Sequence, residues 1–118
     1  MKIPKATVFI EVLRRDKEIP GIGSLKKGTF IQPFPLTRVA AGTGVRWKIK
    51  RGRRGDKFRV DFQDDRSPFP GITRFDNETG ARVASIRGRN FIYHVFVKDG
   101  KTGEEYKIDH SPILCTDP

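Results

Sequence analysis

Residues 45–62 read VRWKIKRGRRGDKFRVDF, and they predict two β-strands joined by a short, very basic glycine turn. Apolar and polar side chains alternate one by one in residues 45–50 and again in residues 57–62. A period of two places one set of side chains in a core and the other set in water. The stretch therefore predicts that Trp47, Phe58 and Phe62 lie in the core.

The same stretch predicts a basic surface. Its outward-facing and turn positions carry Arg46, Lys48, Lys50, Arg51, Arg53, Arg54, Lys57 and Arg59. If the two strands pair directly, like charges stand opposite one another, and each such pair costs up to ~1 kcal/mol. A surface that tolerates this repulsion is a candidate anion-binding site, with the arginines of residues 51–54 at a mobile tip. Whether the two strands share one sheet or cross between two stays open.

The rest of the chain predicts a single all-β domain over residues 1–118. Pro and Gly are so frequent between residues 19 and 44 that no helix is expected there. Further strands are expected at 6–13, 28–34, 37–41, 72–75, 81–86, 90–98, 106–108 and 113–115. Residues 6–13 are largely apolar on both faces, so their register is ambiguous, and this favours a buried or inter-sheet position. Short strands with turn signals between them predict an antiparallel β-sandwich of about seven to eight strands, without substantial helix.

The net charge and the cysteine content limit which partners and which cellular compartment are expected. The chain of 118 residues has a net charge of +10, which favours an acidic protein surface or nucleic acid as partner. Cys115 is the single cysteine, so no intrachain disulfide forms, and a reducing, cytoplasmic setting in a prokaryote or phage is expected. The sequence has no run of ~20 apolar residues, the length that a membrane-spanning helix requires.

Several motifs from residue 45 onward resemble the small cupredoxin-like sandwiches, and immunoglobulin-like sandwiches share much of the pattern. The motifs are Val45-Arg-Trp47, Phe58-Arg-Val60-Asp-Phe62, Pro68-Phe69, Gly88-Arg-Asn-Phe91-Ile-Tyr93 and Ile113-Leu114. The resemblance implies a copper-ligating Cys where this chain has Val95, and a His where it has Lys98 to Lys101. The axial Met is also missing, because the only Met is Met1. A family member without copper, and without any cofactor, is therefore expected.

The remaining candidates for chemistry favour structural roles. His94 lies in the middle of an expected strand, and Asp109-His110-Ser111 are consecutive, whereas the members of a catalytic triad converge from separate elements. The carboxylates Asp61, Asp64, Asp65, Asp76 and Glu78 lack the spacing of a calcium loop. No enzyme activity is predicted.

Three functions remain open. The first is a non-enzymatic interaction module that binds an acidic macromolecule through the basic face. The second is a nucleic-acid-binding domain that contacts phosphates with the same residues. The third is a structural homo-oligomer formed through edge strands, with residues 19–44 as an exchanged arm. The sequence favours the first.

Overall fold

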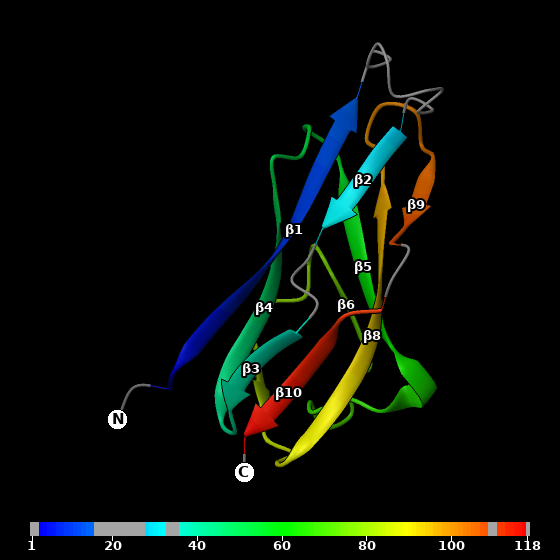
Figure 1. Cartoon of the computed structure of the whole chain (residues 1–118). Helices are drawn as coiled ribbons and strands as arrows, with labels where there is room; N and C mark the ends of the chain where they lie inside the picture. Colours follow the sequence, from blue (N-terminus) through cyan, green and yellow to red (C-terminus); the bar gives the residue numbers. More distant parts are fainter. Residues whose placement is uncertain (1–2, 16–27, 33–35, 109–110, 118) are drawn as a thin grey trace.

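The structure is a computed structural model that describes residues 3–15, 28–32, 36–108 and 111–117, which form a sandwich of two β-sheets (Figure 1). The first sheet has four strands in the order β2-β1-β4-β7. The second has six, in the order β3-β10-β8-β5-β6, with β9 also paired to β8. One 3-10 turn, Gln63–Asp65, is the only helical element in these ranges. The prediction of an all-β sandwich is confirmed.

The four-stranded sheet consists of β1 (Lys5–Arg15), β2 (Gly28–Gln32), β4 (Thr43–Lys50) and β7 (Arg82–Ala84). The six-stranded sheet consists of β3 (Leu36–Ala40), β5 (Lys57–Phe62), β6 (Arg74–Asp76), β8 (Arg89–Lys98), β9 (Glu105–Lys107) and β10 (Ile113–Asp117). The described ranges hold ten strands, more than the seven or eight expected in total, and three of them, β6, β7 and β9, have three residues each.

Two of the strand pairings are parallel, where the sequence predicts an antiparallel pattern. β1 pairs with β4 in parallel, and β10 pairs with β3 in parallel. Parallel neighbours cannot be joined by a tight hairpin and need a crossover. The chain supplies one between β1 and β4, because it passes through β3 in the opposite sheet before it returns. Both sheets are therefore mixed.

β4 and β5 lie in different sheets and do not form a hairpin. The six-residue connection 51–56 carries the chain across one end of the sandwich, the end at which β1 terminates (Figure 1). This arrangement turns the apolar sides of both strands toward each other and their charged sides toward opposite faces. It also avoids the like-charge pairs that direct pairing would create. The sequence leaves open whether the two strands share one sheet or cross between two, and in the structure they cross between two.

The core gathers around Trp47, whose side chain is 5% exposed. Its ring lies 4.8 Å from the ring of Phe75, 5.5 Å from Tyr93 and 6.0 Å from both Phe62 and Phe69, between ring centroids. Most of these contacts are edge-to-face, the geometry that aromatic quadrupoles favour. Trp47 belongs to the four-stranded sheet, whereas Phe62 and Tyr93 belong to the six-stranded sheet. The cluster therefore joins the two layers.

Two polar atoms buried in this cluster, the indole nitrogen of Trp47 and the hydroxyl of Tyr93, make no well-formed hydrogen bond to any described residue. Burial raises the pKa of Tyr93 to about 12, and the neighbouring Trp47 indole opposes this shift only in part. A buried, unpaired hydroxyl destabilises the folded state by about 1–3 kcal/mol. The centre of the core thus contains the Tyr93 hydroxyl, which hydrophobic packing does not need.

We predict that Trp47→Ala lowers the free energy of unfolding by about 3–5 kcal/mol, because it removes a large buried ring and leaves a cavity. Urea denaturation followed by circular dichroism measures the loss. Phe9→Leu, at an exposed position of the same sheet, should change stability by no more than about 0.5 kcal/mol. Equal losses in the two variants would contradict the central role of Trp47.

We predict that Tyr93→Phe is neutral or stabilising near neutral pH, because it removes the unpaired hydroxyl. In the wild type the folded-state pKa of about 12 exceeds the ordinary value of 10.0, so the folded state holds the proton more tightly. The titration of Tyr93 therefore leaves stability unchanged below pH 10.0 and lowers it as the pH rises toward about 12. The two-unit shift corresponds to about 2.7 kcal/mol.

Urea midpoints across the alkaline range measure this loss of stability. The Tyr93→Phe protein should lack the part of the loss that Tyr93 causes. Parallel curves for wild type and variant would show that Tyr93 is not the group that titrates.

Candidate basic interface

Three cations form a row along the outer face of the four-stranded sheet. Arg46, Lys48 and Lys50 of β4 are exposed, and they alternate with inward-facing Val45 and Trp47. Alternate residues of a strand lie ~6.6 Å apart, so the three charges follow one line. We call these three residues the basic row.

β1 lies beside the basic row and supplies the rest of this face. The parallel register places Thr7 opposite Arg46, Phe9 opposite Lys48 and Glu11 opposite Lys50. The Arg46 guanidinium donates a hydrogen bond to the Thr7 hydroxyl at 3.2 Å. The ammonium of Lys50 lies 5.8 Å from the centroid of the Phe9 ring, a cation–π distance. Lys5, exposed on the same side of β1, adds a fourth cation.

The structure shows which face of β1 is buried, where the sequence leaves the register ambiguous. Val8, Ile10 and Val12 point into the core, whereas the Phe9 side chain is 43% exposed. Lys5, Thr7 and Glu11 share the parity of Phe9, and charged or polar residues at every second position are the signal that indicates an outer face. Sequence reasoning missed Phe9 because apolar residues outnumber polar ones over residues 6–13.

Glu11, the one carboxylate that the described residues place on this face, forms an ion pair with the turn that follows β4. Arg51 adopts a left-handed backbone conformation with φ of 59°, and its guanidinium lies 3.1 Å from the Glu11 carboxylate. An ion pair this exposed adds little stability. Its consequence is electrostatic, because it offsets the negative charge of Glu11 beside the basic row.

The turn 51–56 is anchored, where the sequence predicts a mobile tip. Asp56 is buried, with 7% exposure, and its two carboxylate oxygens accept hydrogen bonds from separate loops. One accepts from the backbone N–H of Arg53 at 2.7 Å and the other from the backbone N–H of Gly100 at 2.9 Å. The backbones of Gly55 and Gly100 also meet, since a Cβ on Gly100 would lie 2.7 Å from the Gly55 Cα. Asp56 thus ties the basic turn to the turn after β8.

An open pocket of about 380 Å³ lies at this end of the sandwich. Its lining consists of Lys48, Ile49, Gly52, Arg53, Arg54, Asp56 and Asn77. Lys48 belongs both to this pocket and to the basic row, so the two are continuous. Three cations converge on the pocket, and its one carboxylate is already bonded to backbone N–H groups. The pocket therefore has the electrostatics of an anion site.

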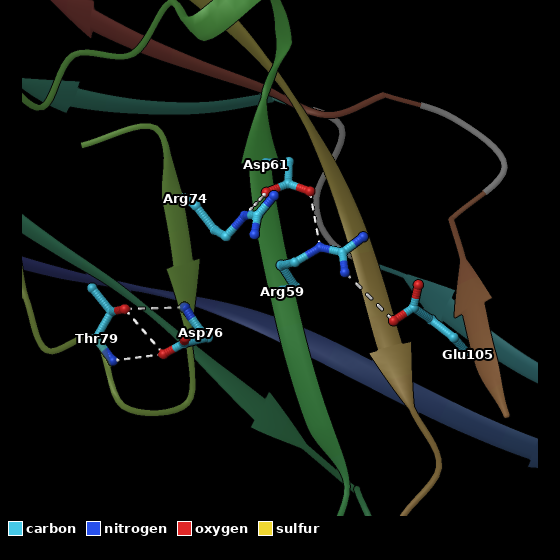
Figure 2. Close-up of polar contacts among 6 residues, drawn as sticks. All are labelled: Arg59, Asp61, Arg74, Asp76, Thr79 and Glu105. Carbon is cyan, nitrogen blue, oxygen red and sulfur yellow. Dashed lines mark hydrogen bonds and ion pairs between the residues drawn. The ribbon is translucent and has the colours of Figure 1, made fainter. Parts of the chain in front are cut away.

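The other two predicted residues, Lys57 and Arg59, face the opposite side of the molecule. Arg59 lies within an ion-pair network, 2.9 Å from Asp61 and 3.6 Å from Glu105, and Arg74 contacts the other oxygen of Asp61 at 2.7 Å (Figure 2). The Arg59 guanidinium also lies 4.2 Å from the Phe96 ring centroid. Carboxylates offset the charge of Arg59 and its side chain packs on Phe96, so Arg59 contributes to the structure of the six-stranded sheet. The predicted basic face is therefore divided between two surfaces.

The remaining sequence candidates have local roles. Asp76 accepts hydrogen bonds from the backbone N–H of Glu78 and from Thr79 (Figure 2), and these bonds hold the pKa of Asp76 below its usual range. His94 is half-buried, with its Nδ1 3.3 Å from the Ser111 hydroxyl. Cys115 is a half-buried free thiol, and Asp109 and His110 lie outside the described residues. Within the described ranges, no three His, Cys, Asp or Glu side chains are placed to hold a metal ion.

We predict that Asp56→Ala destabilises the protein by about 2–4 kcal/mol, because two backbone N–H groups lose charge-assisted hydrogen bonds. Hydrogen exchange should accelerate at the amides of Arg53 and Gly100 beyond the change expected from global stability. Glu78→Ala removes an exposed carboxylate and should leave both amides protected. Unchanged exchange in Asp56→Ala would show that the turn is held by other contacts.

The described ranges contain no helix with the length and apolar character needed to cross a membrane. The chain matches no known protein family and no curated protein sequence. The function of the basic row is therefore inferred from the geometry of this chain alone.

Proposed function

We propose that this protein is a non-enzymatic interaction module that binds an acidic macromolecule through the outer face of its four-stranded sheet. The observation that carries the proposal is the basic row. Arg46, Lys48 and Lys50 are exposed in one line, and among the described residues the only carboxylate beside them is paired with Arg51. A row of like charges without local compensation attracts polyanions and steers their approach.

We propose further that the sandwich is of the cupredoxin-like kind and works without copper. The mixed pairing supports this choice over the immunoglobulin-like alternative, since immunoglobulin sandwiches consist of two antiparallel sheets. The residues at the copper-ligand positions implied by the resemblance support the second part. Val95 is a buried apolar side chain, which cannot ligate a metal. A reducing cytoplasmic setting remains part of the proposal, on the basis of the single cysteine.

Nucleic acid is favoured over an acidic protein surface as the partner. The specific observation is Phe9, an exposed aromatic ring within the cationic face. Aromatic rings beside cations are the arrangement that binds bases and phosphates together. An acidic protein surface would engage the cations but would not use the ring in this way.

Self-association through the six-stranded sheet stays a separate prediction. Ile113 pairs with Leu36 on one side and Ile92 on the other, and the latter two side chains are 45% and 38% exposed. Three adjacent aliphatic side chains beside the edge strand β3 form the apolar contact that such an oligomer would use. Light scattering at high salt would detect the excess mass. Residues 19–27 and 33–35 of the expected exchanged arm lie outside the described ranges.

We predict that the protein binds labelled oligonucleotides with an affinity that falls steeply with salt, measured by fluorescence anisotropy. Arg46→Gln/Lys48→Gln/Lys50→Gln should weaken binding and reduce the log–log salt slope by about two, at ~0.7 per phosphate on single strands. The matched control is Arg38→Gln/Lys57→Gln/Lys98→Gln, which removes the same charge from the six-stranded sheet. This control should keep a slope close to that of the wild type.

Equal losses in the two triple variants would contradict a site at the basic row and indicate diffuse attraction by net charge. A polyglutamate peptide, tested in the same assay, represents an acidic protein surface. Binding of the peptide without binding of oligonucleotides would retain the interaction module and reject nucleic acid as its partner.

A further inference from the structure

We propose that Phe9 is a base-stacking platform and that the partner of the basic row is single-stranded nucleic acid. One base would stack on the Phe9 ring while the adjoining phosphates contact Arg46, Lys48 and Lys50. This inference rests on the proposed function, since it names the class of polyanion and adds a residue that recognises bases rather than charge.

The first support is the exposure of the ring. Phe9 is the only aromatic side chain classed as exposed among the residues whose burial is described. Among the residues whose burial is described, the other aromatic rings lie in the core or are partly covered, as Phe96 is by Arg59. Scattered exposed aliphatic residues are ordinary on protein surfaces. An exposed aromatic ring in the middle of a cationic face is a more specific observation.

The second support is the position of the cations around that ring. Lys48 stands directly opposite Phe9 in the register, with Arg46 and Lys50 as the diagonal neighbours. Neighbouring strands lie about 4.8 Å apart, so all three side chains reach the space above and beside the ring. The Lys50 ammonium is already 5.8 Å from the ring centroid. A stacked base would therefore bring its backbone within reach of several cations at once.

The third support is the pocket beside Lys48, the middle residue of the row. Lys48 lies on the sheet face and also lines the pocket with Arg53 and Arg54. A strand that stacks on Phe9 and contacts Lys48 therefore lies next to this pocket. A phosphate of a neighbouring nucleotide would enter there, because the pocket is open and its single carboxylate accepts backbone N–H groups. The bound strand would thus extend from the face of the sheet to the turn at residues 51–56.

The geometry also distinguishes single strands from duplex. In a duplex the base faces are stacked on one another and are not available to a protein ring. Duplex DNA would then contact only the cations, whereas a single strand would contact the cations and the ring. A preference for single strands that depends on Phe9 is therefore the property to measure.

The test uses the full chain and fluorescence anisotropy with a labelled twelve-nucleotide oligothymidine and a duplex of equal length. Phe9→Leu keeps the apolar bulk and removes the π-face. We expect it to weaken single-strand binding about five- to 100-fold, the range measured for one base–aromatic stack. Duplex binding and the log–log salt slope should stay unchanged. Phe96→Leu, the same substitution on the opposite outer face, is the matched control and should change neither affinity.

Phe9→Trp provides a direct readout. Stacking should quench the new tryptophan on addition of oligothymidine, whereas the buried Trp47 of the wild type should respond little. Urea midpoints of all variants confirm that each is folded before binding is compared.

The outcomes separate this inference from the function on which it rests. If Phe9→Leu binds oligothymidine as tightly as the wild type while the triple variant of the basic row does not, stacking is overturned and the basic interface stands. If wild type shows no preference for single strands over duplex, the single-strand assignment is wrong. If no oligonucleotide binds and polyglutamate does, nucleic acid is rejected altogether.

Discussion

The structure depends on the contact between Trp47 and the aromatic rings of the opposite sheet. A single strand of alternating residues can bury only one side, and two sheets are stable only when their apolar sides share a core. Trp47 provides the largest part of this core from the side of β4, and Phe62 and Tyr93 meet it from the other sheet. Once this contact forms, the charged sides of β4 and β5 must point away from each other. The separation of the basic residues into two surfaces is thus a consequence of the core.

Much of the fold was readable from the sequence because period-two alternation is a strong local signal. It identifies Val45, Trp47, Phe58 and Phe62 as inward-facing, and the structure agrees. Alternation does not say which sheet a strand joins, since the inward set is the same in either. The connection of six residues between β4 and β5 was the available clue, because the commonest hairpin loops have two residues. The parallel pairing of β1 with β4 left no local trace, as it joins residues about forty positions apart.

The candidate site could be predicted only in part, for a similar reason. Cations at alternate positions of one strand are visible in the sequence, and the basic row follows directly from them. Phe9 was concealed by apolar neighbours, although Lys5 and Glu11 mark its parity. Asp56 was visible as one acid in a basic turn, but the sequence gives no sign that its carboxylate meets Gly100. The sequence also gives no sign of the surroundings of Arg59, whose ion-pair partners come from β5 itself and from β9.

The hydrogen bond from the backbone N–H of Gly100 to the Asp56 carboxylate also affects the binding of a partner. Flexible basic loops lose conformational freedom when they close on a ligand, and that loss reduces affinity. Here the backbone that carries Arg53 is fixed when the chain folds, because Asp56 ties it to a second loop 44 residues away in the sequence. The ordering of this backbone is therefore complete before any encounter. The turn is preorganised, so an incoming anion would not need to order its backbone.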